Sequence, residues 1–394
     1  MLPSERENWR GRFGAYALDR HGALRSLNTR SHFVKTLFRL IVLFFIQVIA
    51  LGGSYQQSSS ASVDNNLMVY LPLVQKSAPD EIEYYLDEMN FARMTCITSN
   101  LVNLYGPRHH NFKRFFIDDK CTIGGQSYDN HNLIRASMYV FNGFEELGYN
   151  PGKEFVPEWH DSFNVVAQKI GSVYPNTFIE ISAHVDSVDT TPGASDNAGS
   201  VAAMIEIARV LKDYQNRHSL RFITFVGEEN HLKGSRHHAE RIVARGETIK
   251  AGLVMDGIGW SEIAPDHMNC LWDNGNAETR HISNLFNSVR LEYDIDIEWR
   301  LCDLLQSNQW SDNYAYWEHG LPAVLSIGGQ PYADPNYHSC ADTMSSIDMQ
   351  NVYLAALENL AVTLKLDAEE TQPDAYQAGE STAPALPEGE GISH

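Results

Sequence analysis

Acidic and imidazole side chains follow several short apolar runs of this sequence, an arrangement from which a metal site can be built. Imidazole and carboxylate ligands in this mixture suit zinc or a similar divalent ion, whereas calcium and magnesium prefer oxygen ligands alone. Five ligands, one of them a bridging carboxylate, can hold two ions of the kind that activate water. Six candidate positions are present: His184 after the run 177–183, Glu228 and Glu229 after 220–226, Asp256 after 251–255, and the loop residues Asp196 and His338.

Each position taken alone has a simpler explanation. A single His after a strand usually satisfies a hydrogen bond in the core, and an Asp before a helix, such as Asp196, usually caps that helix. The adjacent acids Glu228 and Glu229 are harder to explain in this way, because neighbouring carboxylates beside a core repel each other unless a cation or a raised pKa relieves them. The occurrence of all these positions in one chain therefore favours a metal centre.

The elements around these positions predict one α/β domain, with a mixed, mostly parallel central sheet sandwiched by helices. Ligands of such sheets bind beyond the carboxyl ends of the strands, which is where the candidate residues lie. We expect helices at 81–102, 129–147, 198–214, 235–245, 277–293, 312–319 and 349–366, and strands at 154–157, 163–170, 177–183, 220–226, 251–255, 294–298 and 322–327.

Six motifs make residues 163–343, nearly half of the chain, resemble the catalytic domain of the M28 family of zinc aminopeptidases. The superfamily includes bacterial leucyl aminopeptidases and glutaminyl cyclases, and the resemblance implies its phosphorylase/hydrolase-like zinc exopeptidase fold. The motifs are His-Val-Asp at 184–186, Gly-Ala-Ser-Asp-Asn at 193–197, Gly-Glu-Glu-Asn-His-Leu-Lys-Gly-Ser at 227–235, Met-Asp-Gly at 255–257, Trp-Ser-Asp-Asn at 310–313 and Tyr-His-Ser at 337–339.

The resemblance implies two Zn²⁺ ions as cofactors and peptides with a free amino terminus as substrates, whose first peptide bond is hydrolysed. It assigns one zinc to His184 and Asp256 and the other to Glu229 and His338, with Asp196 bridging both.

Two more residues receive catalytic roles from the resemblance. Glu228 is the general base that takes a proton from the water held between the ions and delivers it to the leaving amine. Asp186 is the carboxylate that accepts the other imidazole N–H of His184 and so fixes its tautomer.

The sequence departs from the family at two places, neither of which removes a ligand. Asn197 follows the bridging Asp196 where many relatives have a second Asp, and His231 stands where relatives usually have Gly. Relatives usually have a cis peptide after the bridging Asp, which we expect here between Asp196 and Asn197. His231 could line the cleft, and Asp312 matches a family motif and is expected to support the site or the structure.

Other enzymes and a non-enzyme remain alternatives. A glutaminyl cyclase-like cyclotransferase has the same fold but holds one zinc, through residues matching Asp196, Glu229 and His338; here His184 and Asp256 complete a second site. A carboxypeptidase or dipeptidase on a related fold is a further possibility. A non-catalytic binding protein with the peptidase fold is a third, although such relatives lose ligands and this chain keeps all of them.

Charge argues against a nucleic-acid partner. The 394 residues carry 50 acidic and 30 basic side chains, a net charge of −20 that would repel a phosphate backbone. Eight of the basic residues lie before residue 40, so the rest of the chain is still more acidic. We expect peptide substrates; nothing in the sequence indicates the oligomeric state.

The N-terminal segment predicts export. The basic stretch is followed by an apolar run at 40–52, which is shorter than a membrane span and fits the core of a signal peptide, although an uncleaved anchor is an alternative. We therefore divide the chain into a signal peptide or anchor at 1–53, a flexible linker at 54–80, the peptidase domain at 81–366 and an acidic, disordered tail at 367–394. The expected location is secreted or extracellular, with membrane contact only through an uncleaved N-terminal segment.

Three further expectations concern cysteines, histidines and aromatic residues. The most economical disulfides join Cys96 to Cys121 and Cys270 to Cys302 and leave Cys340 unpaired, although buried free thiols are an alternative. The pairs His109-His110 and His237-His238 lie beside basic residues and are expected on a solvated surface. Aromatic residues at 310, 314, 316 and 317 are expected in the core or in a substrate pocket.

Overall fold

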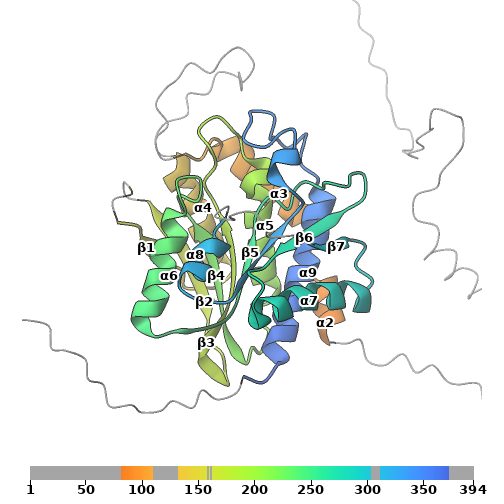
Figure 1. Cartoon of the computed structure of the whole chain (residues 1–394). Coiled ribbons are helices and arrows are strands. Elements are labelled where there is room, and N and C mark those ends of the chain that lie inside the picture. The colour runs from red at the N-terminus through yellow and green to blue at the C-terminus, as the bar shows by residue number, and fades with distance from the viewer. Residues whose placement is uncertain (1–80, 110–131, 158, 160–161, 303–310, 372–394) are drawn as a thin grey trace, which may run out of the picture. The chain divides into compact units, whose positions relative to one another are not determined.

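The computed structural model of this chain describes residues 81–109, 132–157, 159, 162–302 and 311–371 (Figure 1). Among these residues no helix is both long and apolar enough to cross a membrane. The apolar run at 40–52, the linker at 54–80 and residues 372–394 of the tail lie outside the described residues. The predictions made for them stay predictions.

The order of helices and strands follows the expected alternation. The helices are α2 (Glu81–Asp87), α3 (Phe91–Tyr105), α4 (Asn132–Glu146), α5 (Gly199–Val210), α6 (Lys233–Arg245), α7 (Ala277–Glu292), α8 (Asn313–Glu318) and α9 (Met349–Ala368). The strands are β1 (Gly152–Phe155), β2 (Phe163–Lys169), β3 (Tyr174–His184), β4 (His218–Phe225), β5 (Thr248–Met255), β6 (Met268–Trp272), β7 (Glu298–Leu301) and β8 (Ala323–Ile327).

The strands form one eight-stranded sheet in the order β1-β2-β4-β3-β5-β8-β6-β7. The central strand β3 pairs in parallel with β4 and β5, and β5 pairs in parallel with β8. Antiparallel pairs join β1 to β2, β2 to β4, and β6 to β8. The predicted mixed, mostly parallel sheet is confirmed, and the carboxyl ends of β3, β4 and β5 lie beside one another.

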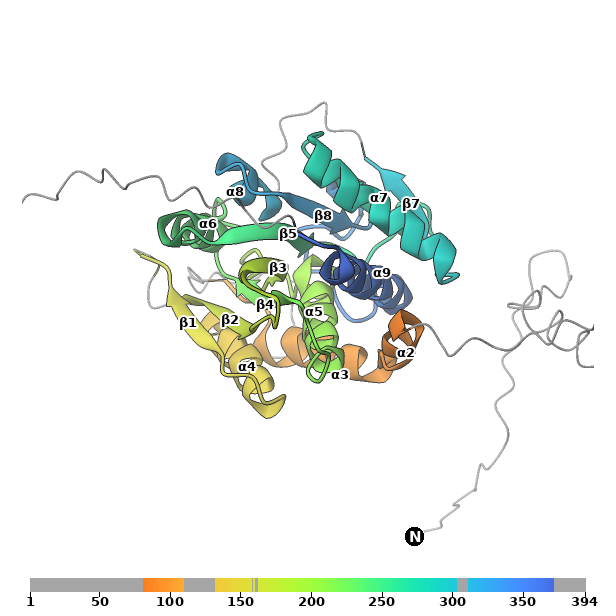
Figure 2. The same ribbon diagram turned by 90° about the horizontal axis from the view of Figure 1, so that it is seen from below.

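Each face of the sheet is covered by its own layer of helices, with α3, α4 and α5 on one face and α6 and α8 on the other (Figure 2). Successive side chains of a strand point to opposite faces. On β4, Leu220 and Phe222 therefore pack in the cluster that contains α5, and Ile223 and Phe225 pack in the cluster beside α6 and α8. All four are fully buried, which explains why this strand is one continuous apolar run.

Several boundaries differ from the prediction. The expected helix at 81–102 is broken between α2 and α3, because the side chain of Asn90 caps a new helix by accepting the N–H of Arg93. Strand β6 was not predicted, and the strand expected at 294–298 lies later, at β7, because Asp294 has a φ of 52° and forms a turn.

The boundary of the acidic tail is wrong by two residues. Helix α9 continues to Ala368, and the buried carboxylate of Asp367 accepts the backbone N–H groups of Arg217 and His218. The acidic composition of the tail gave no sign that its first carboxylate anchors the last helix to β4. Asp367 and Ala368 therefore belong to the domain.

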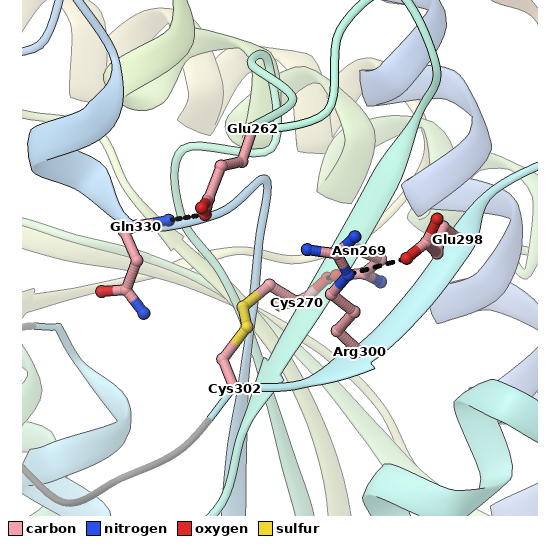
Figure 3. Close-up of a disulfide and its surroundings, with 8 residues drawn as sticks. Glu262, Asn269, Cys270, Glu298, Arg300, Cys302 and Gln330 are labelled. Atoms are coloured by element: carbon pink, nitrogen blue, oxygen red, sulfur yellow. Dashed lines mark hydrogen bonds and ion pairs between the residues drawn. A yellow bond between two sulfur atoms is a disulfide. The ribbon is translucent and has the colours of Figure 1, made fainter.

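One disulfide joins Cys270 on β6 to Cys302, just after β7 (Figure 3). This pair is the predicted one. The other expected pair is wrong, because Cys96 is an exposed free thiol on α3. Cys340, which we expected to be unpaired, is disulfide-bonded. Spacing along the sequence favoured the nearest partners, but the fold and not the spacing decides which cysteines meet.

A buried ion network ties α6 to the sheet. His238 Nδ1 lies 3.0 Å from Glu154 Oε1 and Nε2 lies 3.4 Å from Glu180 Oε1. The expectation of a solvated surface is wrong for His238, which is 1% exposed. Burial opposes its charge, but the two carboxylates raise the pKa of His238 to about 9. Despite burial, contacts with His238 also lower the pKa values of Glu154 and Glu180 to about 2.

We predict that this network loses stabilising strength as the pH rises from about 6.5 to about 9. The pKa of His238 is higher in the folded chain than in the unfolded chain, so its contribution is complete below pH 6.5 and disappears as the folded state loses the proton. The loss in unfolding free energy is at most about 3 kcal/mol. Measured by urea unfolding at both pH values, the free energy of unfolding should decrease more in the wild type than in His238→Gln. Replacing the exposed His319 by Gln should leave this decrease as large as in the wild type. An equal decrease in all three proteins would contradict the prediction.

Candidate metal centre

The candidate residues lie at one edge of the sheet, as the strand ends predict. His184 is the last residue of β3, Asp256 directly follows β5, and Glu228 and Glu229 follow β4 after a turn at Gly227. The parallel alignment of β3 with β4 and β5 brings these three segments together. The other two candidates arrive from loops: Asp196 from the segment before α5, and His338 from the segment before α9.

The five predicted ligands form two groups that share one carboxylate. In the first group, His184 Nε2 lies 3.2 Å from Asp196 Oδ1 and 3.2 Å from Asp256 Oδ1. In the second group, His338 Nε2 lies 3.2 Å from Asp196 Oδ2 and 3.1 Å from Glu229 Oε2. Asp196 therefore presents one oxygen to each group, as a bridging ligand must.

The spacing and chemistry of both groups fit zinc. Ligand atoms held tetrahedrally at about 2.0–2.1 Å from zinc lie about 3.3 Å apart, close to the nitrogen–oxygen distances in each group. One nitrogen and two carboxylate oxygens per group leave a coordination position open, which is the pattern of catalytic zinc sites. Glu229 Oε1 is buried and has no hydrogen-bond partner within the part of the chain that the structure describes. A buried carboxylate oxygen without a partner destabilises the folded state unless a cation compensates its charge.

Electrostatics also favour a cation, because four carboxylates surround two imidazoles here. Burial and the nearby charge of Asp196 raise the pKa of Glu229 to about 7, and burial raises the pKa of Glu228 well above its usual range. Burial opposes ionisation of Asp196, yet contacts with the two imidazoles hold its pKa well below the usual range. Burial likewise opposes the charge of His338, but Asp196 and Glu229 raise its pKa to about 10.

Asp186 lies behind the centre and contacts three of its residues. Its backbone carbonyl lies 3.2 Å from His184 Nδ1, and its carboxylate oxygen Oδ1 lies 3.6 Å from the same nitrogen. The carboxylate accepts the backbone N–H groups of Glu228 and Glu229, at 3.3 and 3.2 Å. A proton held on Nδ1 leaves Nε2 free to bind a metal. The expected hydrogen bond to the imidazole thus goes to the carbonyl, and the carboxylate fixes the turn that carries both glutamates.

Asn197, the departure from the family pattern, has a clear structural role. It is fully buried, its Nδ2 donates to Met255 O at 3.0 Å, and its Oδ1 accepts Gly257 N at 3.3 Å. These two backbone groups flank Asp256, so one amide holds that ligand from both sides. The peptide bond between Asp196 and Asn197 is cis, as expected.

His231, the second departure, and Asp312, which matches a family motif, do not belong to the candidate metal groups. His231 is exposed and has a φ of 68°, a conformation that explains why glycine suits this turn. Asp312 is fully buried, and burial raises its pKa to about 7.

His109, expected on a solvated surface, is half-buried and contacts the side chain of Asn230 at 3.2 Å.

A pocket opens beside the centre. Its lining combines the carboxylates of Asp196, Glu228, Asp256 and Asp334 with apolar side chains. Tyr316 lies in the core, which was one of the two expected places for it, and Trp310 is outside the described residues. Trp260 and Trp272, which were not predicted, line the pocket. A pocket that joins apolar walls to convergent carboxylates is typical of a site that binds a small part of a substrate.

Sequence reasoning also missed two charged residues that hold the loops of the centre. Arg108 is 0% exposed and its guanidinium donates to backbone carbonyls next to the site. Asp342 accepts the backbone N–H groups of Ser195 and Asp196 at 2.7 and 3.1 Å. The position of Asp342 four residues after His338 was a usable signal, whereas Arg108 resembled an ordinary basic surface residue.

Comparison with known proteins identifies relatives of this architecture. Residues 164–363 match the sequence profile described as peptidase family M28. Over 184 residues, 45% of this chain, the sequence is 29% identical to aminopeptidase YwaD from Bacillus subtilis. The match spans only 38% of that enzyme's length.

Solved structures share the fold. LapB from Legionella pneumophila superposes with a TM-score of 0.61 at 18% identity, covering 73% of this chain and 75% of LapB. A glutaminyl cyclase from Bacteroides thetaiotaomicron bound to N-acetylhistamine superposes with a TM-score of 0.51 at 15% identity, covering 72% of this chain and 99% of the cyclase. The fold alone therefore does not distinguish an aminopeptidase from a glutaminyl cyclase.

We predict that Asn197→Ala destabilises the fold by about 1–3 kcal/mol, because the buried Met255 O and the partly buried Gly257 N lose their hydrogen-bond partner. The free energy of unfolding in urea measures this loss. Asn284→Ala, an exposed substitution on α7, is the matched control and should change stability by less than about 0.5 kcal/mol. Equal stability of the two variants would show that the amide of Asn197 does not hold the segment around Asp256.

Proposed function

This chain belongs to peptidase family M28, and we propose that it is a zinc aminopeptidase that hydrolyses the N-terminal peptide bond of peptides. The observation that carries the proposal is the shared carboxylate of Asp196, which faces His184 and Asp256 with one oxygen and Glu229 and His338 with the other. This arrangement supports a centre of two ions.

Each ion would be held by one of the two groups, with Asp196 common to both. Zinc ions bound there would supply Lewis-acid activation of a water molecule and of the scissile carbonyl. Asp186 and Asn197 support this use of the site, because they hold the backbone on either side of the ligands.

Glu228 is the residue we propose as general base. Its carboxylate lines the pocket together with Asp196 and Asp256. It also belongs to a third candidate group with His184 and Glu229, but neither of the two groups that Asp196 bridges needs it as a ligand. From there it can accept the proton of the attacking water on a carboxylate oxygen and return it to the leaving amine. The backbone hydrogen bond from Glu228 N to Asp186 fixes the turn and thus the direction of the side chain.

The pocket supports cleavage at an amino terminus. Its apolar walls, formed in part by Trp260, Trp272, Leu325 and Ile327, suit the first side chain of a peptide. The carboxylates among its lining residues attract the positively charged amine of that residue. A blocked amine would lose this attraction while it keeps the apolar contacts.

The alternatives fit the centre less well. A one-zinc cyclotransferase would need only Asp196, Glu229 and His338, and would leave the close approach of His184 to Asp256 without a purpose. A binding protein without activity would not need a free carboxylate at Glu228. The fold likeness to a glutaminyl cyclase does not separate these cases, so the substrate test below includes a peptide that begins with Gln.

We also propose that the protein acts outside the cytosol. The apolar run at 40–52 supports export. The disulfide between Cys270 and Cys302 and the disulfide-bonded state of Cys340 support an oxidising compartment, since cytosolic proteins rarely keep such bonds.

We predict that Glu228→Gln lowers kcat for a leucyl anilide by about 10²–10⁴-fold and leaves bound zinc unchanged, because the amide cannot accept the proton. Activity assays with metal analysis of the same samples check both parts. Glu240→Gln, an exposed change on α6, is the control and should behave like the wild type.

The same assay distinguishes the competing functions. The wild type should cleave free-amine anilides and leave acetylated ones intact, and it should not cyclise a peptide with N-terminal Gln. Equal turnover of free and acetylated substrates would rule out the aminopeptidase, and cyclisation without hydrolysis would favour the cyclotransferase.

Export predicts the state of the N-terminus. Protein expressed from the full chain should leave the cytosol, either released with an N-terminus after residue 53 or retained at the membrane with residues 1–53 attached. N-terminal sequencing of the medium and membrane fractions checks this. Full-length protein confined to the cytosol, with Cys270 and Cys302 as free thiols, would contradict it.

A further inference from the structure

Arg108 is the most deeply buried cation near the centre, and its contacts differ from those of an ordinary ion pair. The side chain is 0% exposed, so it cannot touch a substrate. Its guanidinium donates to four backbone carbonyl oxygens: Val185 O at 2.6 Å, Pro192 O at 2.7 Å, Gly193 O at 2.8 Å and Leu101 O at 3.2 Å.

Three of these carbonyls belong to the segments that carry two of the three ligands of the first group, His184 and Asp196. Val185 lies between His184 and Asp186, and Pro192 and Gly193 begin the loop that leads to Asp196. One rigid guanidinium therefore spans the backbone beside His184 and the backbone before Asp196. The main chain of Arg108 adds to this, because Arg108 N donates to Ser187 Oγ at 3.0 Å and Arg108 O accepts Ser187 N at 3.2 Å.

Gly193 shows how close this approach is. A Cβ atom at Gly193 would lie 2.6 Å from Arg108 Nη2, and the residue has a φ of 68°, which favours glycine. The loop can therefore reach the guanidinium only with glycine at this position.

The same loop is held from the opposite side by Asp342. Its carboxylate accepts Ser195 N and Asp196 N, and its backbone carbonyl accepts Ala194 N at 3.4 Å. Carbonyl groups of the loop thus point to Arg108 and N–H groups of the loop point to Asp342. Because Asp342 follows His338 in the same loop, this clamp also ties the second imidazole to the bridging carboxylate.

Charge complements this geometry. The carboxylates of Asp342, Asp196, Asp186 and Glu229 supply the opposite charge that acts on Arg108, whereas the guanidinium hydrogen bonds given above go to backbone carbonyls. The guanidinium donates its hydrogen bonds to neutral carbonyls, so its positive charge is compensated by the carboxylates around it. The arginine and the acidic centre therefore stabilise each other.

We infer that Arg108, together with Asp342, is a positioning residue that sets the separation of His184 and Asp196 and so determines zinc affinity and kcat. The inference rests on the proposed function. Lysine can keep the charge at position 108 but cannot reproduce the planar fork that reaches several carbonyls at once. The consequence of Arg108→Lys should therefore be a loosened centre within an otherwise folded domain.

The test compares Arg108→Lys with Arg221→Lys, a control at another buried arginine, which pairs with Glu180 and Glu247 in the sheet. Zinc affinity is measured on metal-free protein by competition with a chromogenic chelator, and kcat and KM on the zinc-loaded enzyme. Arg108→Lys should weaken zinc binding by about 10–100-fold and lower kcat, with KM within about twofold, as expected when support behind metal ligands is lost. Arg221→Lys should keep the zinc affinity and kcat of the wild type, whatever its thermal stability.

Zinc affinity and kcat within twofold of the wild type in folded Arg108→Lys would overturn the inference. Equal losses of zinc affinity in both lysine variants would do so as well, because they would show a general effect of damaging the core. If Arg108→Lys does not fold, Asp342→Asn carries the same expectations, because it removes one of the two carboxylate oxygens that accept the backbone N–H groups of Ser195 and Asp196. Zinc binding is measured without a peptide substrate. A wild type that binds zinc but does not hydrolyse peptides would therefore contradict the proposed function but not this inference.

Discussion

The constraint on which this structure depends is the concentration of negative charge at the carboxyl edge of the sheet. Asp196, Glu228, Glu229 and Asp256 converge on two imidazoles in a largely buried place. Such a group of carboxylates is unfavourable inside a protein unless cations compensate it. Two zinc ions at the bridged groups would satisfy this requirement, and their positive charge would activate a water molecule. The stability of the edge and the proposed chemistry therefore have one physical origin.

The fold resists this repulsion by fixing backbone, not only side chains. Asp186 holds the turn that carries both glutamates, Asn197 holds the segment around Asp256, and Asp342 holds the N–H groups of the loop that carries Asp196. Each contact joins segments that are far apart in the sequence. The ligands thus reach their positions through hydrogen bonds to their neighbours, which leaves their own carboxylate and imidazole atoms free for metal.

The sequence could predict the ligands because three of them, His184, Glu229 and Asp256, follow buried strands. Parallel strands end at the same edge of a sheet. It could not predict β6, since Met268–Trp272 is short and follows an irregular segment, nor the burial of His238, since polar residues on a helix are normally solvated. The disulfide of Cys270 followed from short spacing, whereas the free thiol of Cys96 did not. Arg108 was missed because its role depends on carbonyls of distant loops, which leave no pattern in the sequence.

The central claim is that five side chains hold two zinc ions with Asp196 between them. The most direct test is a crystal structure with anomalous difference maps recorded on both sides of the zinc absorption edge. The account predicts two peaks, one beside His184 and Asp256 and the other beside Glu229 and His338, each within bonding distance of a different oxygen of Asp196. A single peak confined to the second pair, or no zinc signal at this edge of the sheet in zinc-loaded protein, would contradict it.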